Sequence, residues 1–196
     1  MNRFLKNLTD PVQSILIGYL GFFVGMLVCI LIRPEGLMAD QGFSYFGGFI
    51  NTGLISLLSY LWTSMFLYWA AQLLERENPK KLRYIAVCLK VMAVLIILIG
   101  LTPHTILDQI HKVFGSALFI LQLGLSFVFV SQKEFAKFRL LLIFVELASG
   151  IASAYYLPLD KGYLLETQFL YQLAFFGILL NVLKNRASSM HHSSES

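Results

Sequence analysis

Charged residues are scarce in this chain. Only 13% of its 196 residues are Asp, Glu, Lys or Arg, whereas about a quarter of a typical soluble domain is charged. So few charges cannot cover a globular surface, which excludes a soluble enzyme and a nucleic-acid-binding domain. The 57% hydrophobic content excludes a disordered chain as well. The sequence therefore predicts an integral membrane protein.

Cysteine and the common catalytic motifs are also scarce or missing. The two cysteines, Cys29 and Cys88, fall near opposite ends of their expected helices, on the order of 18 Å apart in depth and beyond disulfide reach. The sequence contains no G-x-S-x-G, H-E-x-x-H, CxxC or G-x-x-x-x-G-K-[ST] motif. The loops are too short for an ATPase or sensor domain, so any activity must be built from the helices and outer loops.

What the chain has is six apolar blocks long enough to cross a bilayer. We predict an all-α fold in which residues 1–186 form a single polytopic bundle of six transmembrane helices, and residues 187–196 form a polar, disordered tail. The predicted spans are 11–32, 47–72, 84–101, 112–131, 139–157 and 164–183. All five prolines lie at block ends, where a missing backbone donor is tolerated. We expect the first span to be retained because no small-residue cleavage site follows it.

The second apolar block is longer than one straight span requires. Its apolar run, 43–74, would be about 48 Å long as a helix, which exceeds a hydrocarbon core of about 30 Å. Four glycines lie within or just before the first third of this run, at Gly42, Gly47, Gly48 and Gly53. We therefore expect this part to be a bent outer segment that leads into the helix.

The distribution of Lys and Arg predicts the orientation. Eleven of them lie at the N-terminus, in 75–83 and 132–139, and in the tail, whereas the opposite side holds only Arg33, Lys112 and Lys161. By the positive-inside rule both termini are cytoplasmic. The expected location is the cell membrane, the plasma membrane if the source is bacterial. The net charge of +4 follows from this bias and does not require a nucleic-acid partner.

Two charged residues fall inside predicted spans. Lys90 and Glu146 each lie seven residues from the cytoplasmic start of a span, about 10 Å deep. A charged side chain inside the bilayer is energetically costly, so such residues usually pair with another group or serve a function. We predict an intramembrane ion pair between them, with Gln122 near the same level. Two alternatives stay open: Lys90 extends to the inner surface beside a protonated Glu146, or the two residues form a proton or ion relay.

A second polar group is expected on the outer face. His104, Asp108 and His111 are spaced to share one face of a helix that starts with Thr102 as N-cap and Pro103 as first residue. Such residues can bind a metal or act as acid and base. They are the metal candidates, with further ligands from Asp40 or Glu166, although no spacing specifies a cofactor. His111, Asp108 and Glu166 are the catalytic candidates. Gln168 and Gln172 are expected to line an outer cavity beside Glu166.

Small residues predict close helix contacts. Gly18, Gly21 and Gly25 form a glycine face on the first span, and 149–154 contains a similar set of small residues on the fifth. We interpret both as helix-packing faces, which leaves open docking to a membrane-protein partner.

The order of features resembles the DRAM-like six-helix membrane proteins, in particular their uncharacterised bacterial relatives. The similar parts are Ser44-Tyr45-Phe46-Gly47, Asn51-Thr52-Gly53-Leu54, Pro103 followed by His111, and Glu166 at the start of the sixth span. The resemblance implies a polytopic protein of endomembranes or the bacterial plasma membrane. Because members of the wider group are associated with remodelling of lipid anchors, it favours a role toward lipid and points to Ser44, Asn51, His111 and Glu166 as binding positions.

Three functions are consistent with these observations. The first, which we favour, is binding, sensing or remodelling of membrane lipid by the outer His/acid cluster, with Gln168 among the binding residues. The second is a transporter or channel for ions or small solutes, because polar residues lie at two depths. The third is a non-catalytic structural subunit of a membrane complex. The sequence does not decide whether the protein is an enzyme.

Overall fold

The computed structural model describes residues 10–39, 41–77, 82–102, 104–130, 137–156 and 163–192. Within these ranges the chain is entirely helical and contains no strand. The long helices are α2 (Pro11–Ile32), α3 (Ile50–Glu77), α4 (Arg83–Leu101), α5 (His104–Val130), α6 (Lys137–Tyr156) and α7 (Leu164–His192). Two short 3-10 helices, η1 (Pro34–Met38) and η2 (Gly42–Gly48), connect α2 to α3. The predicted helical class is confirmed.

Five of these helices are long and apolar enough to cross a membrane, namely α2, α3, α4, α5 and α6. The segment predicted as a sixth span does form a helix, α7. It is not among those five, and it carries Glu166, Gln168 and Gln172 in its first turns. The structure thus supports a membrane protein with several spans.

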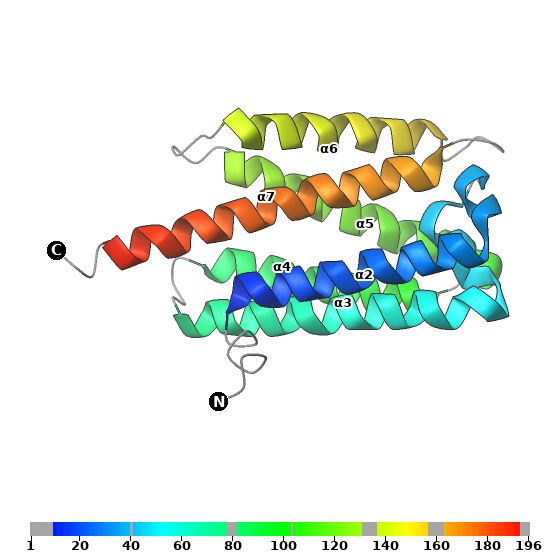
Figure 1. Ribbon diagram of the computed structural model, residues 1–196, viewed down its shortest axis with the longest axis horizontal. Coiled ribbons are helices and arrows are strands. Elements are labelled where there is room, and N and C mark those ends of the chain that lie inside the picture. The colour runs from blue at the N-terminus through cyan, green and yellow to red at the C-terminus, as the bar shows by residue number, and fades with distance from the viewer. Residues whose placement is uncertain are drawn as a thin grey trace.

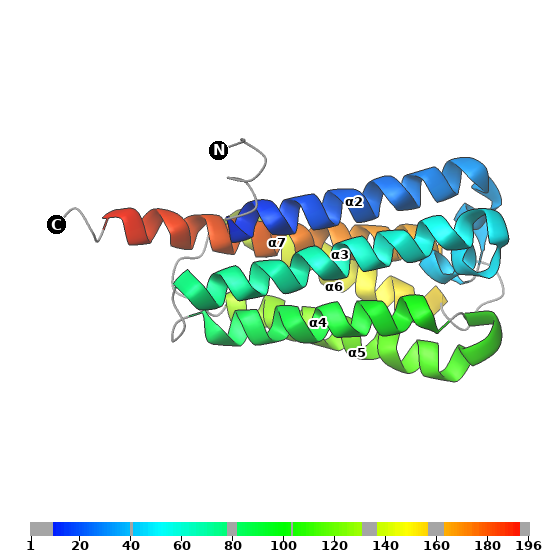
Figure 2. The same ribbon diagram turned by 90° about the horizontal axis from the view of Figure 1, so that it is seen from below.

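The helices run side by side along the long axis (Figures 1 and 2). α3 packs extensively on both α2 and α4, and α6 packs on α7. α5 lies between these groups and contacts α6 and α7 only sparsely. Both η helices lie at the end of the bundle opposite the chain termini (Figure 1). The central seam between α2 and α7 is aromatic, with Tyr19 stacked on Phe176 at 4.7 Å between ring centroids.

The glycine face of α2 packs against α3 of the same chain. A side chain at Gly21 would collide with Trp62, and one at Gly25 would collide with Ser59. The close approach also lets Trp62 Nε1 donate to the Ile17 carbonyl at 3.1 Å. This face is therefore occupied within the chain rather than open to another protein, and α2 and α3 are held at a short separation.

The connection between α2 and α3 folds back over the end of the bundle. Gly42 has a φ of 55°, a conformation that side chains disfavour, and the Gln168 side chain lies directly against it. Phe46 is fully buried, and its carbonyl accepts a 2.8 Å hydrogen bond from Thr52 Oγ1. The predicted bent segment before the second span is thus confirmed as the 3-10 helix η2.

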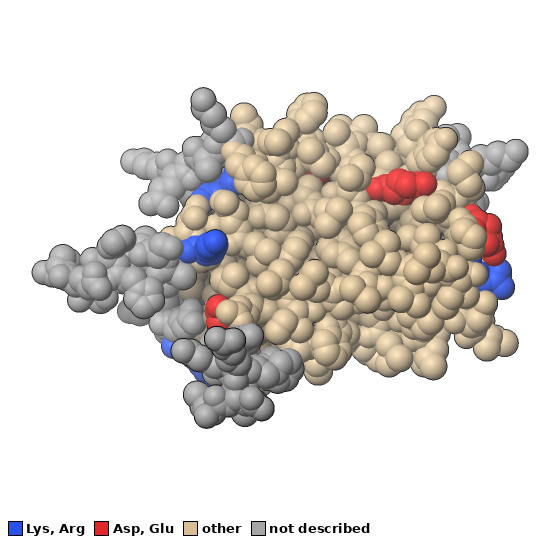
Figure 3. All heavy atoms as spheres, in the orientation of Figure 1, with Lys and Arg blue, Asp and Glu red and all other residues tan. Residues whose placement is uncertain are grey.

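Charged side chains concentrate toward the ends of the bundle. On the face in Figure 3, the middle is uncharged while Lys, Arg, Asp and Glu lie toward the two ends. At the end with η1, Arg33 pairs with Glu35 at 2.9 Å and lies 3.7 Å above the centre of the Phe49 ring. An uncharged band between charged ends is the pattern of a protein surrounded by lipid.

Three helix ends differ from the predicted ones by five residues or more. α3 continues to Glu77, and α7 continues to His192, through most of the segment predicted as a disordered tail. α5 starts at His104, but its backbone is non-helical at Leu107, where φ is −126° and ψ is 45°. Thr102 is the C-cap of α4, where its hydroxyl donates to the Leu98 carbonyl at 2.7 Å. The prediction that it caps the following helix is wrong, because its hydroxyl satisfies a carbonyl at the end of α4.

Candidate functional site

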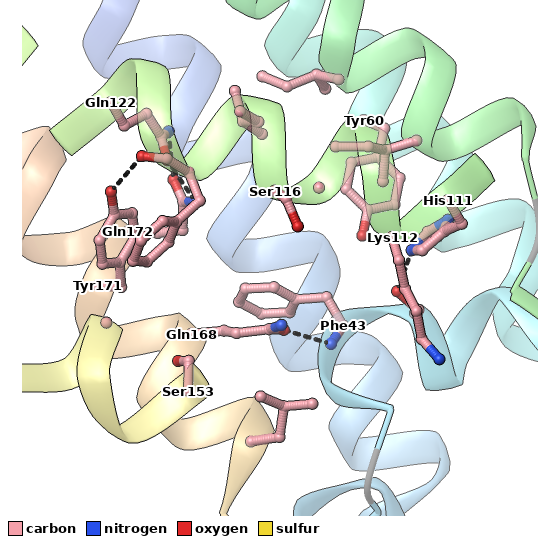
Figure 4. A pocket seen from close by; sticks show the side chains of 18 of the residues that line it. Phe43, Tyr60, His111, Lys112, Ser116, Gln122, Ser153, Gln168, Tyr171 and Gln172 are labelled. Carbon is pink, nitrogen blue, oxygen red and sulfur yellow. Dashed lines mark hydrogen bonds between the residues drawn. The ribbon is translucent and has the colours of Figure 1, made fainter. Parts of the chain in front are cut away.

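A cavity of about 710 Å³ lies between the helices near η2. This volume falls within the roughly 300–1,000 Å³ of ligand-binding pockets. Its walls come from α2, η2, α3, α4, α5, α6 and α7 (Figure 4). The polar lining residues nearest η2 are Ser44, His111, Lys112 and Gln168, whereas Phe22, Leu118 and Phe119 make up much of the apolar wall. The cavity thus has a polar end beside η2, an apolar wall, and further polar residues at Gln122 and Gln172.

The cavity reaches the outer surface of the bundle at α5 and α6. Ser116, Ile120 and Ala154 line it and are also exposed, with Ile120 68% exposed. α5 and α6 contact each other little along their length. These two helices are among those apolar enough to cross a membrane, so the opening faces the region that lipid chains would occupy.

Ser44 and His111 form a hydrogen-bonded pair at the polar end. His111 is only 8% exposed, and its Nδ1 lies 2.6 Å from the Thr102 carbonyl oxygen. Because a carbonyl can only accept, Nδ1 carries the proton of the neutral ring. Nε2, 2.5 Å from Ser44 Oγ, is then the acceptor, and the serine hydroxyl donates to it. The Thr102 carbonyl selects the tautomer that can accept the Ser44 proton.

Gln168 fixes the segment that carries Ser44. Its Oε1 accepts a 3.0 Å hydrogen bond from the Phe43 backbone N–H, the residue directly before Ser44. The Ser44 N–H donates to the Gln41 carbonyl at 3.2 Å. The Gln41 carbonyl, the turn glycine at 42 and the Gln168 amide therefore hold the backbone around Ser44 in place. Figure 4 shows the hydrogen bond between Phe43 and Gln168.

The inner end of the cavity is closed by a reciprocal amide pair. Gln122 and Gln172 exchange hydrogen bonds of 3.0 and 3.1 Å, and the Tyr171 hydroxyl donates to the Phe119 carbonyl at 2.9 Å. Figure 4 shows these side chains together on one side of the cavity. Gln172 and Gln168 thus line the cavity as predicted, whereas Glu166, expected beside them, is not among the lining residues.

The predicted ion pair between Lys90 and Glu146 is wrong. Lys90 Nζ lies 2.7 and 2.8 Å from the two carboxylate oxygens of Glu75 on α3. Glu146 is fully buried on α6, with Ser126 and Tyr171 as its polar neighbours. Depth along the helices did not determine the partner, because Lys90 lies on the α3–α4 side of the bundle, where α3 supplies a nearer carboxylate.

A double-mutant cycle distinguishes the two pairings. Lys90 and Glu75 are each about one-third exposed, so we expect Lys90→Met and Glu75→Gln to show a coupling energy of about 0.2–1 kcal/mol in unfolding measurements. Lys90→Met and Glu146→Gln should be additive within about 0.5 kcal/mol. A larger coupling for the second pair would contradict the observed arrangement.

The structure does not continue one regular helix through the three metal candidates, as the predicted shared face required. The non-helical backbone at Leu107 interrupts the helix between His104 and Asp108, and the His104 side chain lies outside the described residues. Asp108 Oδ2 is 2.8 Å from Lys112 Nζ, and both nitrogens of His111 make hydrogen bonds. Among the described residues, no three His, Cys, Asp or Glu side chains are placed to hold a metal. Asp40 lies outside those residues.

Two positions taken from the resemblance lie away from the cavity. Asn51 Oδ1 accepts a 3.2 Å hydrogen bond from Arg33 Nε, so it belongs to the charged outer surface. Glu166 begins α7 with one carboxylate oxygen buried and without a hydrogen-bond partner. Of the five predicted binding residues, Ser44, His111 and Gln168 come together at the cavity.

Sequence reasoning missed several lining residues. Lys112, Ser116 and Tyr60 line the cavity, and the Thr102 carbonyl orients His111. A backbone carbonyl leaves no signal in a sequence. Lys112 had such a signal, because it is one of only three Lys or Arg residues on the predicted outer side.

Comparisons with protein-family models, with curated proteins and with solved structures found no match. The resemblance to the DRAM-like proteins therefore stays a prediction.

Proposed function

We propose that this protein is a six-span membrane protein with both termini in the cytoplasm, and that it binds or remodels a membrane lipid in the cavity between its helices. The single observation that carries the proposal is the cavity, in which a polar end beside η2 adjoins an apolar wall that includes Phe22, Leu118 and Phe119, and which is lined by exposed residues of α5 and α6. A lipid has the same division between a polar headgroup region and apolar chains.

The charges support the expected orientation of that lipid. The ends of α3, α4 and α6 that carry Arg76, Arg83 and Arg139 lie at one end of the bundle, and η2 lies at the other end. If the basic loops are cytoplasmic, the polar end of the cavity lies in the outer half of the membrane. Ser44, His111 and Lys112 would then lie at the depth of ester groups and headgroups, while the lipid chains extend past Phe119.

Photo-crosslinking tests the location of the lipid. The protein is placed in nanodiscs that contain phosphatidylcholine with a diazirine near the end of one acyl chain. After illumination, we expect crosslinks in the α5 peptide around Leu118 and Phe119 to exceed those in the lipid-facing surface of α2 around Leu20 and Val24, which are exposed. Crosslinks spread in proportion to exposure would contradict the proposal.

The structure makes the other two functions less suitable. A charge relay needs neighbouring groups, and Lys90 pairs with Glu75 instead of Glu146. A docking role needs an open glycine face, and Gly18, Gly21 and Gly25 pack on α3. Solute flux into liposomes that is abolished by Glu146→Gln would favour transport over lipid binding.

A further inference from the structure

We propose that Ser44 and His111 form a nucleophile–base pair that hydrolyses an acyl ester of a glycerophospholipid bound in the cavity. The proposal rests on the proposed lipid-binding function and deepens it.

The first support is the direction of the hydrogen bonds. A serine nucleophile needs a neutral histidine whose acceptor nitrogen faces the hydroxyl, and a third group that fixes the ring from the other side. Here Nε2 faces Ser44 Oγ, and the Thr102 carbonyl holds Nδ1 at 2.6 Å. The third group is a neutral carbonyl at the C-cap of α4 instead of a carboxylate.

The second support is access. A serine and a histidine bonded to each other in a packed interior would serve only structure, but both of these residues line the cavity. The apolar part of the cavity leads from this pair toward Phe119 and Ile120. An acyl chain lying there would place its ester, which terminates the chain, at the polar end where Ser44 lies.

The third support is a hydrogen-bond donor close to the serine. Because Gln168 Oε1 accepts from the Phe43 N–H, the orientation of this amide is determined, and its Nε2 hydrogens form the donor end. Gln168 lines the same cavity and contacts the residue before the nucleophile. A donor in that place can stabilise the negative oxygen that develops when an ester carbonyl is attacked.

The reaction balances with water as the only co-reactant. Ser44 Oγ bonds to the ester carbonyl carbon while its proton passes to His111 Nε2, which leaves the carbonyl oxygen negative. The carbon–oxygen bond to glycerol then breaks, and that oxygen takes the proton from Nε2, so a lysophospholipid leaves and an acyl-serine remains. Water adds to the acyl carbon and gives a proton to Nε2. The acyl–Oγ bond breaks, Oγ regains the proton, and a fatty acid is released.

A covalent serine probe tests this pair. The purified protein is incubated in mild detergent with an alkyl fluorophosphonate, and the modified residue is located by peptide mass spectrometry. We expect one adduct on Ser44, none on Ser44→Ala, and labelling at least about 100-fold slower for His111→Gln, the range of general-base contributions. Ser149→Ala, whose hydroxyl bonds carbonyls of its own helix outside the cavity, should label like wild type.

Lipid retention separates failure of the pair from failure of the binding site. The same samples are analysed by native mass spectrometry for bound phospholipid, and by fatty-acid release from phosphatidylcholine vesicles. Ser44→Ala should retain bound phospholipid but should no longer release fatty acid. Wild-type protein that retains lipid but is not labelled at Ser44, or is labelled equally in His111→Gln, would overturn the hydrolase and leave lipid binding standing. Wild-type protein with neither lipid nor label would overturn both.

Discussion

Gly115→Trp is expected to reduce the phospholipid retained by the purified protein at least about tenfold. Gly115 lines the cavity on α5, and a Cβ built there meets no atom within 4 Å. A tryptophan can therefore extend into the cavity without displacing a helix, and it occupies space that a lipid needs. A tenfold loss corresponds to about 1.4 kcal/mol of binding free energy.

The control for this variant lies on the same helix. Gly124 also has open space around a Cβ, is exposed and does not line the cavity. Gly124→Trp therefore makes the same chemical change on α5 and should keep the wild-type amount of lipid. Equal lipid loss in both variants would mean that bulk on α5, and not occupation of the cavity, causes the effect.

The largest effect on stability is expected from Phe46→Ala, at about 3–5 kcal/mol in the free energy of unfolding. The Phe46 ring is fully buried, lies against Gly36 of η1 and makes an edge contact with Tyr45 at 5.6 Å between centroids. Its removal leaves an unfilled cavity in the segment that carries Ser44. The loss can be measured by unfolding in mixed micelles.

Phe144→Ala is the matched control for that variant. Phe144 lies on α6 and is 70% exposed, so its truncation should change the free energy of unfolding by about 0.5 kcal/mol or less. Phe46→Ala should in addition slow the labelling of Ser44, because η2 positions that residue. A small change in stability for Phe46→Ala would show that η2 is not anchored by this ring.

Helix positions could be predicted well because each depends on local properties of the chain. α2 begins and ends where the apolar block does, and Asp10 caps it by accepting from the Val12 N–H at 2.9 Å. α4 and α6 differ from the predicted spans by at most two residues at each end. The kink at Leu107 carries no such signal, since no glycine or proline lies within three residues of it.

Side-chain partners were harder to predict because they depend on which helices are neighbours. Lys90 and Glu146 have matching depths, but α4 packs on α3 rather than on α6, so Glu75 is the partner. For the site, the resemblance singled out Ser44 and His111, which the structure brings into contact. It also singled out Asn51, which instead bonds Arg33 on the outer surface. Spacing along the chain does not show that Ser44 meets His111 while Asn51 bonds Arg33.

The most direct test of lipid binding is native mass spectrometry of the gently solubilised wild-type protein. We predict that the protein carries a phospholipid that survives detergent removal in the gas phase and is missing from Gly115→Trp. The claim that the cavity holds a lipid would be contradicted if folded wild-type protein appeared only at its polypeptide mass, and if Gly124→Trp under the same conditions also carried no phospholipid.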